Sequence, residues 1–208
     1  MNQATQTLTL QGEVGSLEVL MDSPSEGVVL GTAVIAHPHP LFGGTMHNKV
    51  VQTLARAFVQ CGWRAVRFNF RGVGASAGTY DEGRGEALDM QRVIEQLVPD
   101  GPVALAGFSF GAFVTTHVVH ALGEMRLPRA LVLVGTAASR FEVAPVPQAL
   151  HERCLVVHGE QDDTVPLASV MDWARPQFLP ITVIPGGEHF FHGQLPLLKS
   201  LVIRHLKA

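Results

Sequence analysis

The chain has 208 residues, 47% hydrophobic and 16% charged, a composition typical of one globular domain with a full core. Its formal net charge of −3 at pH 7 offers no basic face for a nucleic acid or an anionic membrane, so we expect neither as a partner. Residues 1–16 are polar and lack the pattern of a signal peptide, and no apolar run reaches the roughly 18 residues of a membrane span. We therefore expect a cytoplasmic protein.

Strands and helices alternate along most of the chain. Residues 7–10 and 17–21 alternate apolar and polar side chains around Gly12 and Gly15, which predicts an antiparallel hairpin. Hydrophobic periodicity predicts further strands at residues 32–36, 65–70, 103–108, 131–135, 155–159 and 181–184. It predicts helices at residues 47–61, 86–98, 110–122, 167–174 and 195–207. This order is typical of an α/β domain with a mostly parallel sheet, two N-terminal antiparallel strands and helices on both faces. We expect one such domain over residues 1–208.

The segment 105–114 contains Gly-Phe-Ser-Phe-Gly between a predicted strand and a predicted helix. Ser109 then lies at a sharp strand-to-helix turn that exposes its hydroxyl. Gly107 and Gly111 permit this turn because a Cβ at either position would collide with neighbouring chain. The N–H of Phe110 falls in the first turn of the helix, where unpaired donors and the helix dipole favour an oxyanion. A glycine-bounded turn with a capping serine fits the same five residues, so this motif alone leaves catalysis open.

Two later loops offer partners for the serine. In parallel sheets, catalytic and ligand-binding residues usually lie at the carboxyl ends of the strands. There, residues 158–166 offer the carboxylate of Asp162, and residues 185–192 offer the imidazole of His189. For acyl transfer, Ser109 would attack the carbonyl, His189 would take its proton, and Asp162 would hold the imidazole in the required tautomer.

These elements resemble the α/β-hydrolases, whose triad has the same chain order of serine, acid and histidine. The resemblance covers nearly the whole chain. His-Gly-Glu-Gln-Asp-Asp-Thr-Val-Pro at 158–166 is similar to the superfamily's H-G-x-x-D-x-x-V-P and assigns the acid to Asp162, and G-x-x-H at 186–189 assigns the base to His189. Three longer segments resemble small bacterial α/β-hydrolases without a lid: His-Pro-His-Pro-Leu-Phe-Gly-Gly, Arg-Phe-Asn-Phe-Arg-Gly-Val-Gly-Ala-Ser and Gly-Glu-His-Phe-Phe-His-Gly. The resemblance implies an α/β-hydrolase fold with no lid domain.

The second oxyanion donor is expected from the loop after residue 36. The resemblance places this role on the backbone N–H of His39, although the loop departs from the usual His-Gly opening. Pro38 and Pro40 have no N–H to donate. The N–H of Leu41 is the alternative.

Several competing interpretations remain. Asp163 competes as the acid, although a loop carboxylate near the start of the next helix explains it equally. Residues 72–77 fit the dinucleotide pattern G-x-G-x-x-A, but they do not open directly into a helix and no acidic residue ends a following strand. A non-catalytic binding domain that kept the fold is a further alternative. A metal site is disfavoured because no Cys or carboxylate at a familiar ligand spacing accompanies the three histidines of one loop, His37, His39 and His47.

The remaining histidines and the cysteines carry no partner motif. We expect structural or surface roles for His117, His120, His151, His158 and His205. Cys61 and Cys154 lack C-x-x-C spacing, so we expect reduced, mostly buried thiols without a catalytic role.

We expect a serine hydrolase, carboxylesterase-like, that cleaves small-molecule ester or thioester substrates without a cofactor or metal. A peptidase-like amidase on the same triad is the alternative. Only residues 136–153 lie where lidded relatives insert a covering domain, so we expect an open site. The candidate pocket-lining residues are Leu41, Phe42, Tyr80, Phe141, Phe190, Phe191 and His192. Core packing is the alternative for each aromatic side chain among them.

Overall fold

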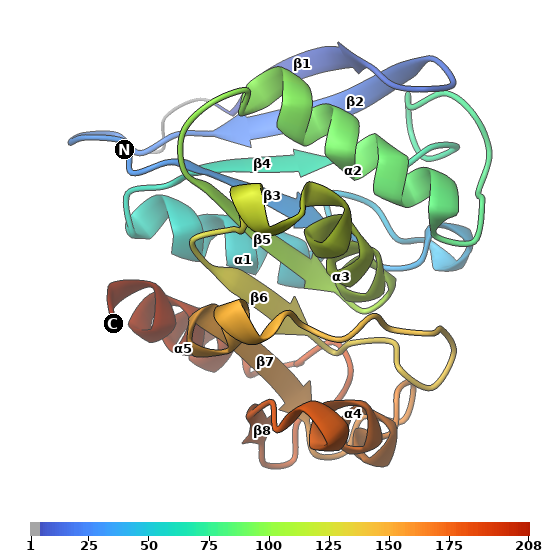
Figure 1. Ribbon diagram of the computed structural model, residues 1–208, viewed down its shortest axis with the longest axis vertical. Helices are drawn as coiled ribbons and strands as arrows, with labels where there is room; N and C mark the ends of the chain where they lie inside the picture. Colours follow the sequence, from blue (N-terminus) through green and yellow to red (C-terminus); the bar gives the residue numbers. More distant parts are fainter. Residues whose placement is uncertain (1–4) are drawn as a thin grey trace.

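The computed structural model describes residues 5–208, which form one eight-stranded sheet in the order β1-β2-β4-β3-β5-β6-β7-β8 (Figure 1). β1 pairs antiparallel with β2, β2 pairs antiparallel with β4, and the other neighbours are parallel. The strands are β1 Gln6–Gln11, β2 Ser16–Asp22, β3 Thr32–Ala36, β4 Arg64–Phe68, β5 Val103–Phe108, β6 Leu131–Val134, β7 Cys154–Gly159 and β8 Ile181–Ile184. The α-helices are α1 Lys49–Gln60, α2 Arg84–Leu97, α3 Phe110–Leu122, α4 Leu167–Ala174 and α5 Leu195–Lys207. Short 3₁₀ helices cover Pro40–Phe42, Glu124–Arg126, Gln148–Arg153 and Arg175–Gln177.

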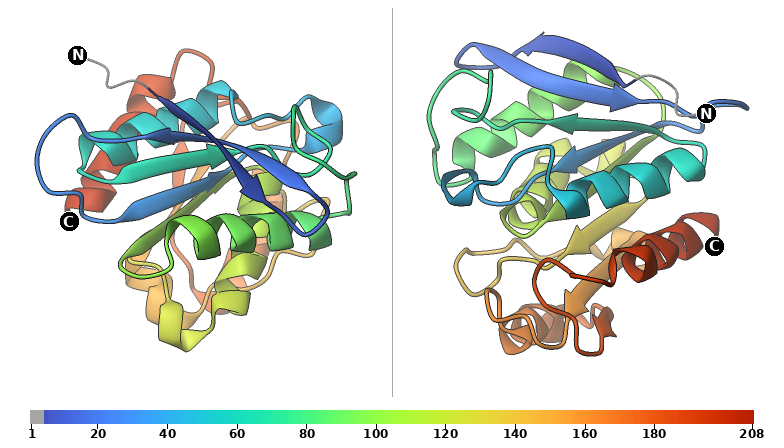
Figure 2. Two further views of the ribbon diagram at one scale, coloured as in Figure 1. Left: turned by 90° about the horizontal axis from the view of Figure 1, so that it is seen from above. Right: turned by 180° about the vertical axis from the view of Figure 1, so that it is seen from behind.

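The sheet divides the hydrophobic core into two clusters. α2 and α3 lie on the near face in Figure 1, and α1 and α5 lie on the other face, seen from behind in Figure 2. Side chains of one strand alternate between the faces: Leu105 packs with the α2–α3 cluster, whereas Ala104 and Ala106 pack with the α1–α5 cluster. Burial on both faces explains why the central strands are apolar throughout.

The predicted elements are confirmed, with small differences at their ends. β4 ends at Phe68 rather than residue 70, because the N–H of Phe70 donates to the ring of His37 at 3.0 Å instead of to a neighbouring strand. α1 begins two residues later than predicted because Asn48 caps it, accepting from the N–H of Val50 at 2.8 Å. Both differences arise from side-chain hydrogen bonds, which periodicity does not report.

Among the elements formed by residues 5–208, none is a lid over the carboxyl ends of the strands. The connection from β6 to β7 consists of a loop and the 3₁₀ helix Gln148–Arg153. The loop is bound to α3, since the carbonyls of Glu142 and Pro145 lie 2.9 and 2.6 Å from the Nε2 atoms of His117 and His120. Within residues 5–208, no helix combines the length and apolar character that a bilayer crossing requires.

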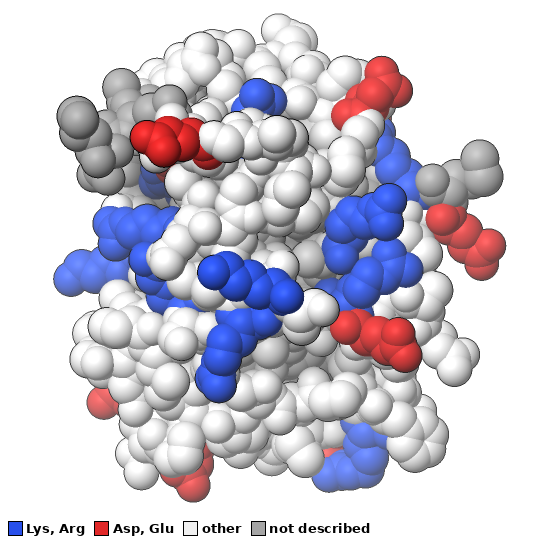
Figure 3. All heavy atoms as spheres, turned by 90° about the vertical axis from the view of Figure 1, so that its left-hand side faces the viewer, with Lys and Arg blue, Asp and Glu red and all other residues white. Residues whose placement is uncertain are grey.

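Charge is unevenly distributed over the surface. Figure 3 views the side from which the parallel strands begin, and there lysine and arginine side chains gather in the middle of the face. The net charge of −3 did not predict this basic region. This basic region lies on the side of the molecule opposite the carboxyl ends of the parallel strands, where the candidate site is located.

Candidate active site

The turn after β5 holds Ser109 in a conformation that L-residues rarely adopt, with φ 56° and ψ −116°. The two flanking glycines are required by close approach, as predicted. A Cβ on Gly107 would lie 2.3 Å from the carbonyl oxygen of Gly111, and a Cβ on Gly111 would lie 2.4 Å from that of Ala36. The strained turn places the serine side chain beyond the end of the sheet, at the N-terminus of α3.

Three side chains from three loops form one continuous set of hydrogen-bond contacts. The Oγ of Ser109 lies 3.0 Å from Nε2 of His189, and Nδ1 of His189 lies 2.6 Å from Oδ2 of Asp162. All three residues are at least 93% buried, since their exposed fractions are 7%, 3% and 5%. This geometry fits the roles of nucleophile, base and orienting acid that we expect from the sequence.

The acid loop and the histidine loop approach each other through two glycines. A Cβ on Gly159 would lie 2.3 Å from the carbonyl oxygen of Gly187, and the N–H of Gln161 donates to the same oxygen at 2.9 Å. This contact brings Asp162 beside His189. Asp163 instead points to the surface, where it accepts only from its neighbour Thr164 at 3.3 Å among the described residues.

The Asp162 carboxylate has a separate set of partners for each oxygen. Oδ1 accepts from the N–H groups of Thr164 and Val165 at 3.0 and 2.7 Å. Oδ2 faces His189 and also lies 3.4 Å from Nε2 of His158. That ring is fully buried, and its Nε2 lies 2.8 Å from the carbonyl of Val165, which requires a proton on Nε2. Burial lowers the pKa of His158, so the ring is neutral and positions the acid loop.

The loop after β3 presents backbone N–H groups beside the serine. The N–H of His39 and that of Phe110 donate no hydrogen bond to any residue in the part of the chain described, 5–208. The N–H of Leu41, the alternative donor, is occupied, because it donates to Nδ1 of His39 at 3.2 Å. His37 fixes the start of the loop: its Nε2 accepts from the N–H of Phe70 and its Nδ1 contacts the carbonyl of Pro38 at 2.6 Å. Burial lowers the pKa of His37 to about 4.

A cavity of about 340 Å³ opens directly beside these groups. Of the predicted lining residues, Phe42, Phe141 and Phe190 line it. The other lining residues are Pro38, His39, Gly43, Gly44, Asn48, Ser109, Phe110, Ala137, Arg140, Thr164, Val165 and His189. Mostly apolar walls around a few polar groups are typical of a small-molecule site.

The remaining predicted lining residues lie elsewhere. Phe191 is fully buried in the α1–α5 core, because its φ of 52° turns the chain between it and its neighbour Phe190. Leu41 is 67% exposed and is not part of the cavity lining, and His192 lies at the surface 3.2 Å from Glu188. Tyr80 lies behind the cavity wall, with its ring centroid 4.9 Å from that of His39.

Comparison with known proteins places the chain in a family. The profile described as serine aminopeptidase, S33, matches residues 33–159, from β3 through the serine turn to the end of β7. The chain belongs to this family of α/β serine hydrolases. An uncharacterized protein of Rickettsia prowazekii is 30% identical over 175 residues, which are 76% of this chain and 71% of that protein.

Two solved structures support the same conclusion over the full length. An α/β serine hydrolase without a lid from Xanthomonas campestris is 36% identical with a TM-score of 0.88, covering 100% of this chain and 95% of that one. An α/β serine hydrolase homologue from Coxiella burnetii is 37% identical with a TM-score of 0.82, covering 99% of both chains. The predicted α/β-hydrolase fold without a lid is therefore confirmed.

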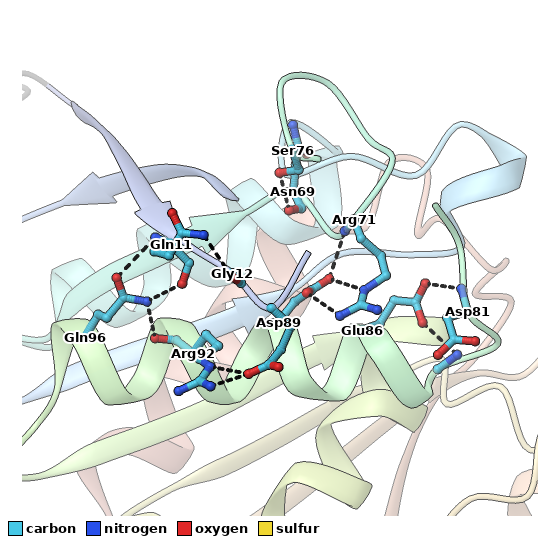
Figure 4. Close-up of polar contacts among 12 residues, drawn as sticks. Gln11, Gly12, Asn69, Arg71, Ser76, Asp81, Glu86, Asp89, Arg92 and Gln96 are labelled. Carbon is cyan, nitrogen blue, oxygen red and sulfur yellow. Dashed lines mark hydrogen bonds and ion pairs between the residues drawn. The ribbon is translucent and has the colours of Figure 1, made fainter. Parts of the chain in front are cut away.

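In this S33 family member, buried polar contacts hold the glycine-rich loop that follows β4 (Figure 4). The guanidinium of Arg71 donates to both oxygens of Asp89 at 3.1 and 2.8 Å, and its backbone N–H donates to the same carboxylate at 2.9 Å. The buried Glu86 accepts from the N–H groups of Asp81 and Gly83 at 2.9 and 2.8 Å. These contacts fix the segment that carries Tyr80 against the active-site loop.

The same loop is not arranged to bind a dinucleotide. The N–H of Ala75 donates to the carboxylate of Glu18 at 3.0 Å, and the N–H of Ala77 donates to the carbonyl of Ser16 at 2.8 Å. A Cβ on Gly74 would lie 2.4 Å from that carboxylate. A protein carboxylate thus occupies the place that a phosphate would need, so the loop is a structural support.

The three histidines considered for a metal site have separate surroundings. His37 is buried, His39 bonds to the Leu41 N–H, and His47 lies at the surface. Within residues 5–208, no group of three His, Cys, Asp or Glu side chains is placed to hold a metal. The two cysteines are free and partly exposed, and burial raises the pKa of both thiols.

Sequence reasoning missed one residue of the cavity, Arg140, and left one contact of the acid unspecified. Arg140 lines the cavity from the loop after β6. This loop follows the carboxyl end of a parallel strand, where function is expected, but it contains no recognisable motif. His158 has the structural role that was expected for it, and its contact with the acid specifies that role. Its place in the motif H-G-x-x-D, four residues before the acid, is the signal that predicts this contact.

Proposed function

We propose that this S33 family member is a serine esterase that cleaves small carboxylic ester or thioester substrates through an acyl-enzyme. The observation that carries the proposal is the unbroken set of contacts from Ser109 Oγ through His189 to Asp162. The proposal keeps the expectations of a cytoplasmic location, a small-molecule substrate and no cofactor.

The contacts support the following steps. Ser109 Oγ attacks the ester carbonyl while its proton passes to Nε2 of His189, and Asp162 stabilises the imidazolium. The oxyanion accepts from the N–H groups of Phe110 and His39, which have no partner within residues 5–208. His189 then gives the proton to the departing alcohol or thiol. A water molecule releases the acid by the same steps in reverse order.

The family's name suggests aminopeptidase activity, and the chemistry of the cavity favours an ester instead. An aminopeptidase must bind the positively charged amino group of its substrate, which calls for a carboxylate near the nucleophile. Among the described residues that line the cavity, none is Asp or Glu, and Arg140 brings a positive charge. A substrate ammonium would be repelled by this arginine.

Two pairs of measurements test the proposal. We expect the kcat/KM for p-nitrophenyl butyrate to be at least about 100-fold higher than that for alanine p-nitroanilide. The anilide carries the ammonium group that Arg140 would repel, and its leaving group is poorer. Ser109→Ala and His189→Ala are each expected to lower kcat by about 10⁴-fold, and the double variant to be scarcely worse, because the residues act as a unit.

Matched controls are Ser169→Ala and His192→Ala, which change the same residue types outside the cavity. Near-wild-type turnover in either active-site variant would remove the basis of the proposal. Faster turnover of the amide than of the ester would favour the aminopeptidase.

The absence of a lid leads to an expectation about acyl length. Each buried methylene contributes about 0.8 kcal/mol only while it contacts a wall, and the cavity is small and open. In a p-nitrophenyl ester series from acetate to palmitate, kcat/KM is expected to rise over the first few carbons and then level or fall. A maximum at long chains, or a jump in rate when the esters aggregate, would contradict an open site for short acyl groups.

A further inference from the structure

Arg140 is the one permanently charged side chain among the described residues that line the cavity. It is exposed, and its guanidinium makes no ion pair or side-chain hydrogen bond with any residue in the range 5–208. Among the described residues, the arginines that do contact a carboxylate all lie outside the cavity lining: Arg67, Arg71, Arg84, Arg92 and Arg175. The positive charge in the cavity that contains Ser109 thus has no ion-pair partner within residues 5–208.

The loop that carries Arg140 is held in place. The N–H groups of Arg140 and Phe141 both donate to the carbonyl of Ala137 at 3.2 Å. The ring of Phe141 stacks on that of Phe113 in α3, with centroids 4.7 Å apart. One residue further on, the carbonyl of Glu142 contacts His117 at 2.9 Å. The guanidinium therefore extends from a fixed backbone position, which reduces the entropy cost of binding a ligand with it.

The wall next to Arg140 supplies no second positive charge. The ring of His39 lies among aromatic rings, with centroids of Phe42 and Phe110 at 4.6 and 4.9 Å. Burial and the charge of Arg140 both lower the pKa of His39, so this ring is neutral at pH 7. A substrate in the cavity thus meets mostly apolar walls, several of them aromatic, and the charge of Arg140.

We propose that Arg140 binds a carboxylate carried by the substrate several bonds away from the scissile carbonyl, so that the enzyme prefers esters with an anionic tail over neutral esters of the same length. The proposal rests on the proposed esterase function and specifies its substrate class. The planar guanidinium suits a carboxylate because it donates two parallel hydrogen bonds. Since the arginine is exposed, we expect a preference of about tenfold, the low end for a charge-assisted pair.

The test compares esters that differ only in the anionic group. The first pair is p-nitrophenyl hydrogen adipate and p-nitrophenyl methyl adipate, which places the carboxylate on the acyl group. The second pair is 3-carboxyphenyl butyrate and phenyl butyrate, which places it on the leaving group. The measured quantity is the ratio of kcat/KM within a pair, because the ratio cancels any general loss of activity in a variant.

In at least one pair, Arg140→Gln is expected to lower the ratio of kcat/KM for the anionic ester to that for the neutral ester about tenfold. The change should come from a higher KM for the anionic ester. Arg140→Lys should retain part of the preference, because it keeps the charge and loses the planar fork. The control Arg204→Gln removes an exposed arginine from the end of α5 and should leave both ratios unchanged. Ratios that stay the same in Arg140→Gln for both pairs would overturn the proposal.

A binding measurement separates this proposal from the proposed function. Calorimetry with monomethyl adipate, on Ser109→Ala and on Ser109→Ala/Arg140→Gln, reports the anion contact without turnover. Binding that the second substitution weakens about tenfold supports the proposal, even if no ester is hydrolysed and the esterase function fails. Equal binding by both variants overturns it, even if Ser109-dependent ester hydrolysis is established.

Discussion

Replacing Asp162 with asparagine should inactivate the enzyme because the direction of one hydrogen bond reverses. In the native site, Oδ1 accepts from two backbone N–H groups at 3.0 and 2.7 Å, whereas Oδ2 faces Nδ1 of His189 at 2.6 Å. An asparagine will keep its oxygen toward the two N–H groups and turn its NH₂ group toward His189. Nδ1 must then accept, so the proton moves to Nε2, the atom that has to receive the proton of Ser109.

The opposite orientation of the asparagine side chain is costly. It would leave the N–H groups of Thr164 and Val165 facing an NH₂ group, and each unsatisfied buried donor costs about 1–3 kcal/mol. The inactive tautomer is therefore favoured by about 2–6 kcal/mol. We expect Asp162→Asn to lower kcat by about 10⁴-fold, which corresponds to about 5.5 kcal/mol of transition-state stabilisation.

The assay is hydrolysis of p-nitrophenyl butyrate under saturating conditions, with circular dichroism to show that the fold is retained. Asp163→Asn is the matched control, because this neighbouring carboxylate is exposed and does not contact His189. It should stay within about tenfold of the wild type. If Asp162→Asn also stays within about tenfold, or if Asp163→Asn is the more damaging change, the argument from hydrogen-bond direction is refuted.

Three further predictions concern the support of the site. The buried His37 has a pKa of about 4, below the ordinary 6.5, so the unfolded chain binds a proton first and the free energy of unfolding decreases as pH falls from about 6.5 toward 4. In urea unfolding, this decrease should be up to about 3 kcal/mol larger in the wild type than in His37→Gln. Equal dependence of the unfolding free energy on pH in the two proteins would contradict this. Gly44→Ala should lower kcat by about 10²-fold in a folded protein, because its Cβ would lie 2.0 Å from the carbonyl oxygen of Pro38 and must displace the oxyanion loop; unchanged kcat would show that the loop tolerates the shift. Asp89→Leu should destabilise the fold by about 3–5 kcal/mol by leaving Arg71 buried without its partner, and the double variant with Arg71→Leu should lose less than the sum of the single changes in urea unfolding; strict additivity would rule out the pairing.

The elements of this fold are largely determined by local sequence. β5, α3 and β8 have the bounds that hydrophobic periodicity predicts, Val103–Phe108, Phe110–Leu122 and Ile181–Ile184. Periodicity succeeds here because each strand is buried on both faces and each helix on one, so the pattern of apolar residues records the element directly. The loops that carry Ser109, Asp162 and His189 follow from the same source, because each begins at the carboxyl end of a predicted strand, whereas these three residues themselves were selected by the motifs and by the resemblance to the α/β-hydrolases.

The direction of side chains within those loops was decided only by tertiary structure. Asp162 and Asp163 are adjacent and chemically alike, and the close approach of Gly159 to the chain at Gly187 determines which of them reaches His189. A loop has no repeating period, so periodicity does not tell which side chain points toward the site, and only the resemblance of residues 158–166 to a known motif favoured Asp162.

The same reason applies to the cavity. Phe190 lines it while Phe191 lies in the core, because one residue with positive φ reverses the direction of the chain between them. Arg140 reaches the cavity because its loop packs against α3, which is a contact between distant parts of the chain. The local sequence thus determined the strands, the helices and the loops that carry the site, and long-range packing decided which atoms face the substrate.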